Sequence, residues 1–375
     1  MGTERCKGSP AKHLILRGGY IGPHDKSPLE SANSVCLNSG PVVRSVAIAA
    51  QVGGGMTRHL AAVRLSMLQI AILCAFLGPL ATHARANTYY VVVSGLGGEP
   101  DYEQRFSAEA KDLDKLFRSS GSTVHSFILA GQDATSTRVK ETLSIVARSA
   151  QSQDDFILIL IGHGSYDGAT YKFNLPGPDL SAEEIAEMCN RISAQRQLVV
   201  DTSSASGGAI QPLRHPGRAI VTATKSGTEK NATVFARYWV EALQDPSADT
   251  DKSDSISALE AFTYATKKTA SFYESQKRLA TEHAVFTDAT AGEPVREASG
   301  SQGALMSSLT LLRIGSTKQA ANDPSKRTLL EKKEDLEQKI DTLKYQKAAM
   351  DPADYKKQLT NMLLELARVQ QELDK

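Results

Sequence analysis

Short apolar runs alternate with helical patterns between residues 88 and 315. Runs of aliphatic, β-branched and aromatic residues predict strands, whereas apolar residues that recur every three or four positions predict amphipathic helices. The predicted strands span residues 89–93, 122–129, 156–161, 198–200, 219–223 and 309–314. The predicted helices span residues 103–118, 137–147, 182–192, 232–243 and 258–279. This alternation predicts one α/β domain over residues 87–315, a three-layer α/β/α fold with a mostly parallel sheet.

Two of these segments carry sharper local signals. Residues 156–161 are apolar at every position, as expected for a central strand buried on both faces. Ser181 and Glu184 form a capping-box pattern before a helix whose apolar face includes Cys189. We therefore expect the Cys189 thiol to be a buried core group and not a nucleophile.

The composition changes abruptly after Gly315. Residues 316–327 are predicted to be a polar linker, and residues 328–375 are charged and helical. Their apolar residues form two heptad-like stripes, made of Leu329, Leu336, Ile340, Leu343 and Met350, then Tyr355, Leu359, Met362, Leu366, Val369 and Leu373. Asp351 followed by Pro352 is typical of a helix start, so the two stripes predict a helical hairpin of coiled-coil type. The stripes can pack within the hairpin and onto the domain, or they can mediate self-association.

Another apolar segment precedes the domain. Residues 65–82 contain no charged side chain, two arginines come shortly before them, and an Ala-Arg-Ala site ends at Ala86. This pattern predicts a secretory signal peptide over residues 56–86 that is cleaved after Ala86, and hence a periplasmic or secreted protein without a stable membrane span. An uncleaved membrane anchor is the alternative. Because a signal peptide stands at the start of a chain, we expect residues 1–55 to be an untranslated or disordered extension.

The charge and the cysteines exclude two classes of protein. The chain has 375 residues, with 43 Lys and Arg against 42 Asp and Glu, and no basic stripe stands out. We therefore expect no nucleic-acid partner. The cysteines are Cys6, Cys36, Cys74 and Cys189, and no two of them form a CxxC pair. A zinc finger and a disulfide scaffold are both excluded.

Candidate chemistry lies after two of the predicted strands. His163 stands between two glycines directly after residues 156–161, and Ser204 lies in a Ser- and Gly-rich turn after residues 198–200. Ligands of open parallel sheets bind beyond the carboxyl ends of the strands, where such residues meet. The Gly164 N–H is a candidate oxyanion donor beside His163. The serines of this turn can also be plain N-cap and turn residues.

This combination resembles the caspase–legumain–gingipain group of cysteine peptidases. In that group a His-Gly pair ends one strand, and a Cys followed closely by Gly ends the next. Here His163-Gly164 matches the histidine loop, and Ser204-Ala205-Ser206-Gly207 matches the nucleophile loop, with Ser204 in the place of the cysteine. The resemblance covers roughly residues 88–287, including residues 280–283, which look like those of bacterial legumain-like exported proteins. It implies a caspase-like fold and a site at His163 and Ser204.

Two departures from the family pattern weaken the implied activity. A serine hydroxyl must lose its proton to a well-oriented base during attack, whereas a cysteine is partly ionised at neutral pH. Legumain also has an Asn after its first strand that helps to place the histidine, and Gly97 stands there in this chain. No side chain that orients His163 is therefore evident from the sequence.

An acidic segment offers a candidate metal site. Its oxygen-bearing side chains match positions 1, 3, 5, 9 and 12 of an EF-hand loop, namely Asp249, Asp251, Ser253, Ser257 and Glu260. Position 6 of an EF-hand loop is Gly because the chain turns sharply there, and this chain has Asp254. The segment therefore predicts either a calcium site or an acidic, solvated loop before a helix.

Three functions are compatible with these patterns, and none of them requires a cofactor. The first is an exported pseudopeptidase, inactive or weakly active, that binds a peptide or a protein. The second is an active hydrolase in which Ser204 attacks, His163 is the general base and Gly164 N–H helps to stabilise the oxyanion. The third is a structural envelope protein that assembles through the C-terminal hairpin.

Overall fold

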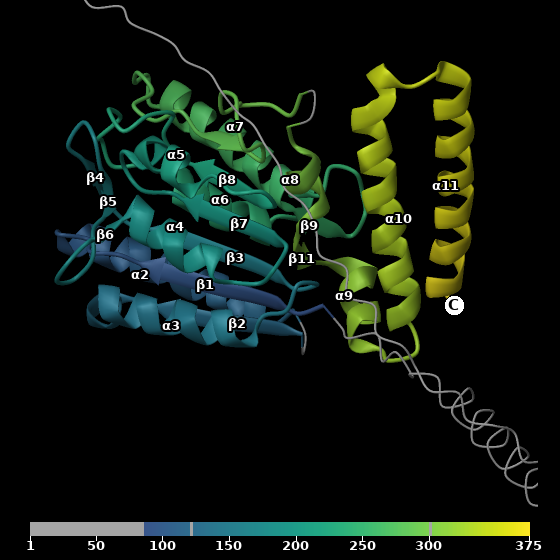
Figure 1. Cartoon of the computed structure of the whole chain (residues 1–375), viewed down its shortest axis with the longest axis horizontal. Helices are drawn as coiled ribbons and strands as arrows, with labels where there is room; N and C mark the ends of the chain where they lie inside the picture. Colours follow the sequence, from purple (N-terminus) through teal and green to yellow (C-terminus); the bar gives the residue numbers. More distant parts are fainter. Residues whose placement is uncertain (1–85, 121–122, 300–301) are drawn as a thin grey trace, which may run out of the picture. The chain divides into compact units, whose positions relative to one another are not determined.

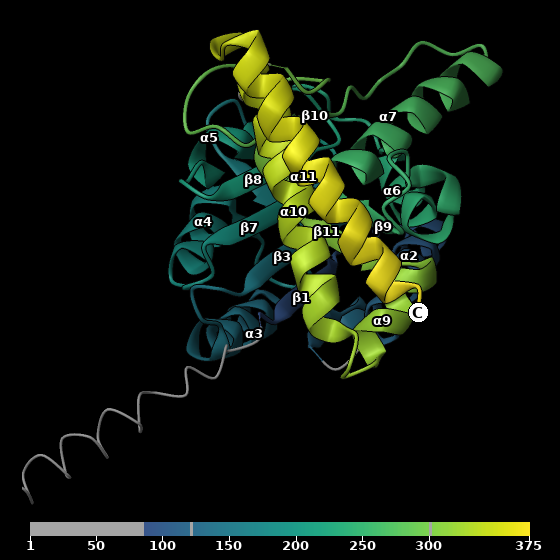
Figure 2. The same ribbon diagram turned by 90° about the vertical axis from the view of Figure 1, so that its right-hand side faces the viewer.

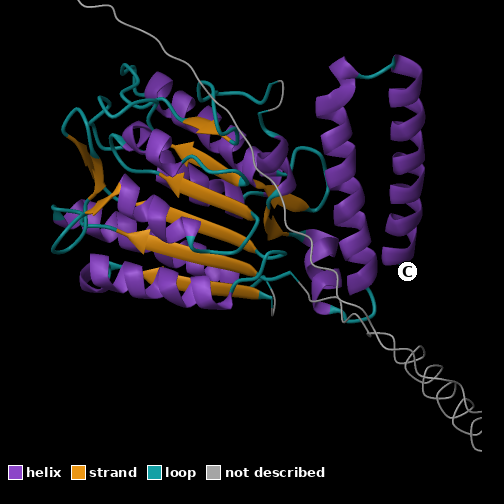
Figure 3. Ribbon diagram, viewed as in Figure 1, coloured by secondary structure: helices purple, strands orange, loops and turns teal. Residues whose placement is uncertain are grey.

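The computed structural model describes residues 86–120, 123–299 and 302–375. The predicted extension and all of the predicted signal peptide except Ala86 lie outside these ranges. Its main element is a six-stranded sheet with the order β10-β8-β7-β3-β1-β2 (Figures 1 and 3). The strands are β1 (Thr88–Ser94), β2 (Val124–Leu129), β3 (Asp155–Ile161), β7 (Arg196–Asp201), β8 (Arg218–Thr222) and β10 (Val285–Thr287). All neighbours run parallel except β10, which is antiparallel to β8.

Helices cover both faces of this sheet, as Figure 3 shows. One face packs on α2 (Pro100–Arg118), α6 (Phe235–Gln244) and α7 (Ala258–Ser275). The other face packs on α3 (Ser136–Ser149), α4 (Ala182–Asn190) and α5 (Ile210–Leu213). Strand β3 lies between these layers and is buried at every residue, because both of its faces meet helices. The predicted three-layer α/β/α fold with a mostly parallel sheet is thus confirmed.

Local sequence signals account for several helix ends. Ser181 and Glu184 form the predicted capping box of α4, and Ser257 and Glu260 form a second one at the start of α7. Each box satisfies backbone N–H groups that a first helical turn leaves without partners. Cys189 of α4 is fully buried in the core, as predicted, and burial raises the pKa of its thiol to about 11.

Three short strands follow β3 and lie outside the main sheet. They are β4 (Gly164–Tyr166), β5 (Tyr171–Phe173) and β6 (Leu180–Ser181), and they form a small antiparallel sheet that the sequence patterns did not indicate. The strand predicted at 309–314 is β11 (Thr310–Arg313), which pairs with β9 (Ser255–Ser257) outside the main sheet. The sixth strand of the main sheet, β10, has only three residues, too few for a recognisable period.

The C-terminal region forms the predicted helical hairpin. Helices α10 (Arg327–Gln346) and α11 (Pro352–Leu373) lie side by side in both views (Figures 1 and 2). The Asp351 carboxylate caps α11 by accepting the N–H of Ala353 at 2.8 Å. Part of the segment expected as a linker is helical, because α9 covers Gly315–Asn322.

Helix α10 also contacts the domain, through α8 (Ala304–Ser308) and through α9. Arg313 of β11 and Glu334 of α10 form a bidentate ion pair with distances of 2.5 and 3.0 Å. Lys333 donates to the Ser253 carbonyl at 2.7 Å. Side chains from the first residues of β1, β3 and β7 line cavities together with residues of α10. The hairpin therefore covers the amino ends of the parallel strands.

Within the described residues, no helix is long and apolar enough to cross a membrane.

Candidate functional site

The carboxyl ends of β3 and β7 bring the two predicted site residues to one edge of the sheet. These strands are direct neighbours, with Leu160 opposite Asp201. His163 follows β3 after one glycine, and Ser204 lies three residues beyond Asp201. The hairpin lies at the opposite end of the strands, so it does not cover this edge (Figure 1).

Ser204 and Gly164 form two reciprocal hydrogen bonds. The Gly164 N–H donates to Ser204 Oγ at 3.1 Å, and Ser204 Oγ donates to the Gly164 carbonyl at 3.0 Å. Ser204 is only 3% exposed. A Cβ at position 164 would lie 2.4 Å from the Ser204 carbonyl oxygen, so only glycine allows this approach. The hydroxyl proton of Ser204 and the N–H of Gly164 are thus both used within the protein.

A buried polar cluster supports the turn that carries Ser204. Asp201 accepts the N–H of Ser203 at 3.0 Å, and Ser203 Oγ lies 2.7 Å from the Tyr171 hydroxyl of β5. Burial raises the pKa of Asp201, and its Oδ2 has no hydrogen-bond partner among the described residues. Ser203 is fully buried, so it is not available to a substrate. The cluster fixes the backbone before Ser204. No local pattern in the sequence indicated that Tyr171 takes part.

The ring of His163 lies among aromatic side chains. It meets Tyr102 and Phe106 of α2 edge-on, with centroid distances of 4.8 and 5.2 Å. Burial is the main reason why the pKa of His163 is lowered, and a backbone group of Gly97 acts in the opposite direction. No carboxylate or amide side chain hydrogen-bonds this ring in the part of the chain that the structure describes. The contact that orients it comes from backbone and aromatic groups.

Gly97 has a steric reason to be glycine. A Cβ there would lie 2.4 Å from the backbone nitrogen of Glu103, and the Gly97 N–H donates to the Glu103 carboxylate at 2.9 Å. The loop after β1 therefore approaches the first turn of α2 too closely for any larger residue. An Asn at this position, as in legumain, does not fit the described backbone.

A second histidine at this edge does have a carboxylate partner. His283 Nδ1 lies 2.6 Å from Glu229 Oε1, and the His283 N–H donates to Glu229 Oε2 at 3.2 Å. The Glu229 carbonyl accepts the N–H of Ala205 at 2.7 Å. Glu229 therefore ties His283 to the turn directly after Ser204. The pair joins residues 54 positions apart, so nothing in the local sequence could reveal it.

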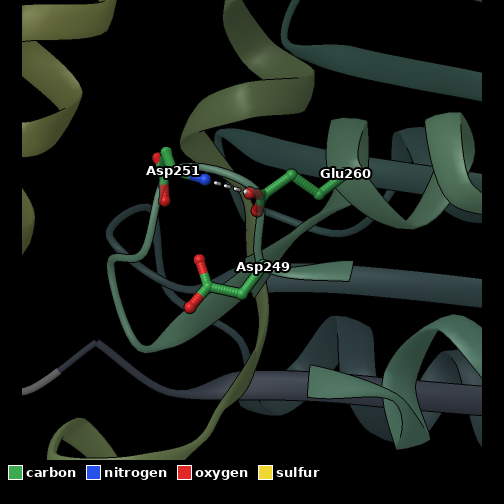
Figure 4. A group of neighbouring side chains, drawn as sticks. All are labelled: Asp249, Asp251 and Glu260. Carbon is green, nitrogen blue, oxygen red and sulfur yellow. Dashed lines mark hydrogen bonds between the residues drawn. The ribbon is translucent and has the colours of Figure 1, made fainter. Parts of the chain in front are cut away.

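The acidic loop brings together three of its five predicted ligands, Asp249, Asp251 and Glu260 (Figure 4). One oxygen of each lies within 4.8 Å of the others. Asp254, at the position where an EF-hand has glycine, adopts the left-handed backbone with φ of 60°. Burial is the main reason why the pKa of Asp249 is raised, and the neighbouring Asp251 carboxyl adds to this rise. The donor set consists of carboxylate oxygens, which suit calcium.

Hydrogen bonds inside the loop also use these carboxylates. Asp249 accepts the N–H groups of Ser253 and Asp254, each at 3.1 Å. Glu260 Oε2 accepts from the backbone and the hydroxyl of Ser257, which keeps the Ser257 hydroxyl inside the capping box. Ser253 Oγ lies 2.9 Å from Ser255 Oγ. Of the two predicted serine ligands, Ser253 therefore bonds another serine, and the Ser257 hydroxyl is used as a donor to Glu260.

Comparisons with known proteins give structural neighbours at low similarity. No protein-family model and no curated protein sequence matches the chain. A structural-genomics protein from Geobacter sulfurreducens aligns over 56% of this chain and 95% of its own, with 11% identity and a TM-score of 0.39. The Drosophila initiator caspase Dronc aligns over 56% of this chain and 82% of its own, with 12% identity and a TM-score of 0.36. Similarity at this level assigns no family and no activity.

Proposed function

We propose that the chain is a caspase- and legumain-like peptidase homologue that has lost, or nearly lost, peptidase activity and binds a peptide or protein segment. The observation that carries this proposal is the reciprocal pair of hydrogen bonds between Ser204 and Gly164. A nucleophilic serine must pass its proton to a base. Here that proton is donated to a carbonyl, and the candidate oxyanion donor is directed at the same hydroxyl.

The environment of Ser204 adds to this argument. Its side chain is nearly fully buried, so a substrate carbonyl reaches it only if the turn moves. The turn is held by Asp201 from one side and by Glu229 from the other. Moving Ser204 would break several buried hydrogen bonds, each of which costs about 1–3 kcal/mol when it is lost without replacement.

An active hydrolase is the second candidate, and one observation favours it. Burial lowers the pKa of His163, which keeps the imidazole neutral and able to accept a proton at pH 7. In that function Ser204 attacks and His163 is the general base.

One experiment separates the two functions. The purified protein is treated with a fluorophosphonate, which labels activated serines, and in parallel is incubated with an immobilised peptide library. We expect the parent protein to show no labelling at Ser204 and to retain peptides. We expect His163→Ala to retain fewer peptides than the parent. His215→Ala is the matched control, because His215 precedes β8 at the opposite edge. Strong labelling at Ser204 would establish the hydrolase, and failure of the parent protein to retain any peptide would refute binding.

Two further features of the proposed function come from sequence patterns. We propose that the protein is exported, with cleavage after Ala86, because residues 56–86 have the order of a signal peptide. N-terminal sequencing of the mature protein should begin at Asn87, and an intact Met1 would refute export. We also propose that Asp249, Asp251 and Glu260 hold a structural calcium ion, supported by the convergence of their carboxylates.

A further inference from the structure

The segment after α7 exposes a pair of basic residues. Helix α7 ends at Ser275, and Lys277 and Arg278 follow in an exposed stretch. The next residue, Leu279, is 91% exposed, whereas the other exposed large hydrophobic side chains of the described residues reach 55% at most. A leucine in this position contributes nothing to the core of the domain.

The backbone of residues 277–281 makes few hydrogen bonds to other backbone groups. Lys277 adopts the left-handed conformation with φ of 51°, which is unfavourable for a residue with a side chain. The last helix-end bonds are from Lys277 N–H to Glu274 and from Arg278 N–H to Tyr273, each 3.0 Å. Between Leu279 and Thr281, no backbone group bonds another backbone group of the described chain. Few bonds therefore oppose an extended conformation here.

Other adjacent pairs of basic residues in the described chain lie in helical surroundings. They are Lys267-Lys268 in α7, Lys326-Arg327 at the start of α10, Lys332-Lys333 within α10 and Lys356-Lys357 in α11. An endopeptidase binds its substrate as an extended strand, so it must first unwind a helix to reach such pairs. Lys277-Arg278 needs no comparable unwinding on its carboxyl side.

The chain is firmly anchored on both sides of the exposed stretch. Tyr273 is buried in α7, and its hydroxyl lies 2.9 Å from the Glu282 carboxylate. Glu282 also accepts the N–H groups of Val234 at 2.8 Å and Phe235 at 3.2 Å, and so caps α6. His283 binds Glu229, and β10 begins two residues later. A break between Arg278 and Leu279 leaves all these contacts in place.

We propose that the Arg278–Leu279 bond is a processing site for a trypsin-like serine endopeptidase, and that the two resulting segments stay associated. The acidic specificity pocket of such an enzyme accepts an arginine side chain at the residue before the cut. Hydrolysis breaks the C–N bond of this peptide. The hydroxyl of a water molecule is added to the Arg278 carbonyl carbon, and the other proton of the water goes to the Leu279 nitrogen. The new carboxylic acid then ionises, and its proton passes to the amine at neutral pH. The products are a new carboxylate on Arg278 and a new ammonium group on Leu279.

The cut has a defined structural consequence at the candidate site. Residues 279–283 lose their covalent tie to α7, and Glu282 and His283 are then held only by side-chain contacts and by β10. His283 stays bound to Glu229, and through Glu229 to the turn after Ser204, but it is no longer covalently linked to α7.

Limited proteolysis of the full chain tests the proposal. The protein is treated with a low ratio of trypsin at neutral pH, and cuts after residue 87 are ordered in time by mass spectrometry and N-terminal sequencing. We expect the earliest of them to yield a fragment that starts Leu-Ala-Thr-Glu-His. In gel filtration the two fragments should elute together at the position of the intact protein, and they should separate only in denaturant.

A pair of variants makes the test specific. Lys277→Gln/Arg278→Gln should slow this cut at least about tenfold, because the specificity pocket loses its cation. Lys356→Gln/Lys357→Gln, which removes two exposed lysines from α11, should leave the rate unchanged. An earlier cut after Arg296 or Lys326, an unchanged rate in the first variant, or separation of the fragments without denaturant would each overturn the proposal. None of these outcomes depends on Ser204, so they are independent of the proposed peptide binding.

Discussion

Ser204 and Gly164 lie 40 positions apart in the chain and bind each other through two hydrogen bonds, of 3.1 and 3.0 Å. The pair connects the turn after β7 to the first residue of β4. It gives the Ser204 hydroxyl a structural role in joining these two segments.

Replacement of Ser204 by cysteine should release the side chain from Gly164. A thiol is a weaker hydrogen-bond donor and acceptor than a hydroxyl, and its thiolate attacks without a strong base. We expect Ser204→Cys to cleave a broad peptide library faster than the parent protein, and His163→Ala in that background to abolish the gain. Cleavage products are read by mass spectrometry.

Cys189 supplies an internal reference for that experiment. It is fully buried, and burial raises the pKa of its thiol to about 11, so alkylating reagents should modify it slowly. If the new thiol at position 204 reacts no faster than Cys189 and no cleavage appears, a thiol at this position is not sufficient for activity.

Glu109 of α2 should make stability depend on pH. Burial raises the pKa of its carboxyl to about 7 from an ordinary 4.5, and its Oε2 has no hydrogen-bond partner within the described residues. Between these pH values the folded protein binds a proton that the unfolded chain has released. The free energy of unfolding therefore falls as the pH rises through this window, by up to about 1.4 kcal/mol for each pKa unit.

In the variant Glu109→Gln, the free energy of unfolding should no longer fall as the pH rises through this window. Its free energy of unfolding, measured by urea denaturation, should rise relative to the parent protein by about 1–3 kcal/mol between pH 5 and pH 8. Glu141→Gln is the control, because Glu141 is exposed. Equal pH profiles for the parent protein and Glu109→Gln would show that Glu109 is not the group responsible.

Calcium should stabilise the protein through the acidic loop. An ion that binds only the folded state raises the melting temperature, and it would also relieve the repulsion between Asp249 and Asp251. We expect millimolar calcium to raise the melting temperature by a few degrees and a chelator to reverse the shift. Asp251→Asn should reduce the shift, whereas Asp374→Asn at the chain end should not. If calcium does not change the melting temperature, hydrogen bonds alone hold the loop.

Removal of the hairpin should leave the sheet domain folded but less stable. A chain that ends at Asn322 keeps the main sheet and the candidate site, because the hairpin covers the opposite ends of the strands. The shortened chain lacks Glu334, the ion-pair partner of Arg313. Because Arg313 is largely buried and poorly hydrated, we expect the loss of this partner to lower the melting temperature. Circular dichroism and calorimetry measure both effects. Glu334→Gln in the full chain should reproduce part of the loss, and complete unfolding of the truncated chain would place the hairpin in the core.

Local patterns in the sequence determined the elements whose causes are local. The apolar residues of β3 predicted a strand buried on both faces, and the capping residues Ser181 and Asp351 predicted where α4 and α11 begin. The alternation of strands and helices was enough for the fold class, because an amphipathic element must bury its apolar side against another layer. The same reasoning placed Cys189 in the core.

Contacts between distant residues decided the character of the candidate site. The sequence placed His163 and Ser204 after neighbouring strands, but the partner of each side chain depends on where loops fold back. Ser204 meets Gly164, and His283 meets Glu229 across 54 positions. Such pairs arise from the packing of segments that have no common local pattern, and hydrogen-bond geometry is settled within tenths of an ångström. For this reason the sequence could name candidate residues, whereas only the tertiary structure could show which atoms they bind.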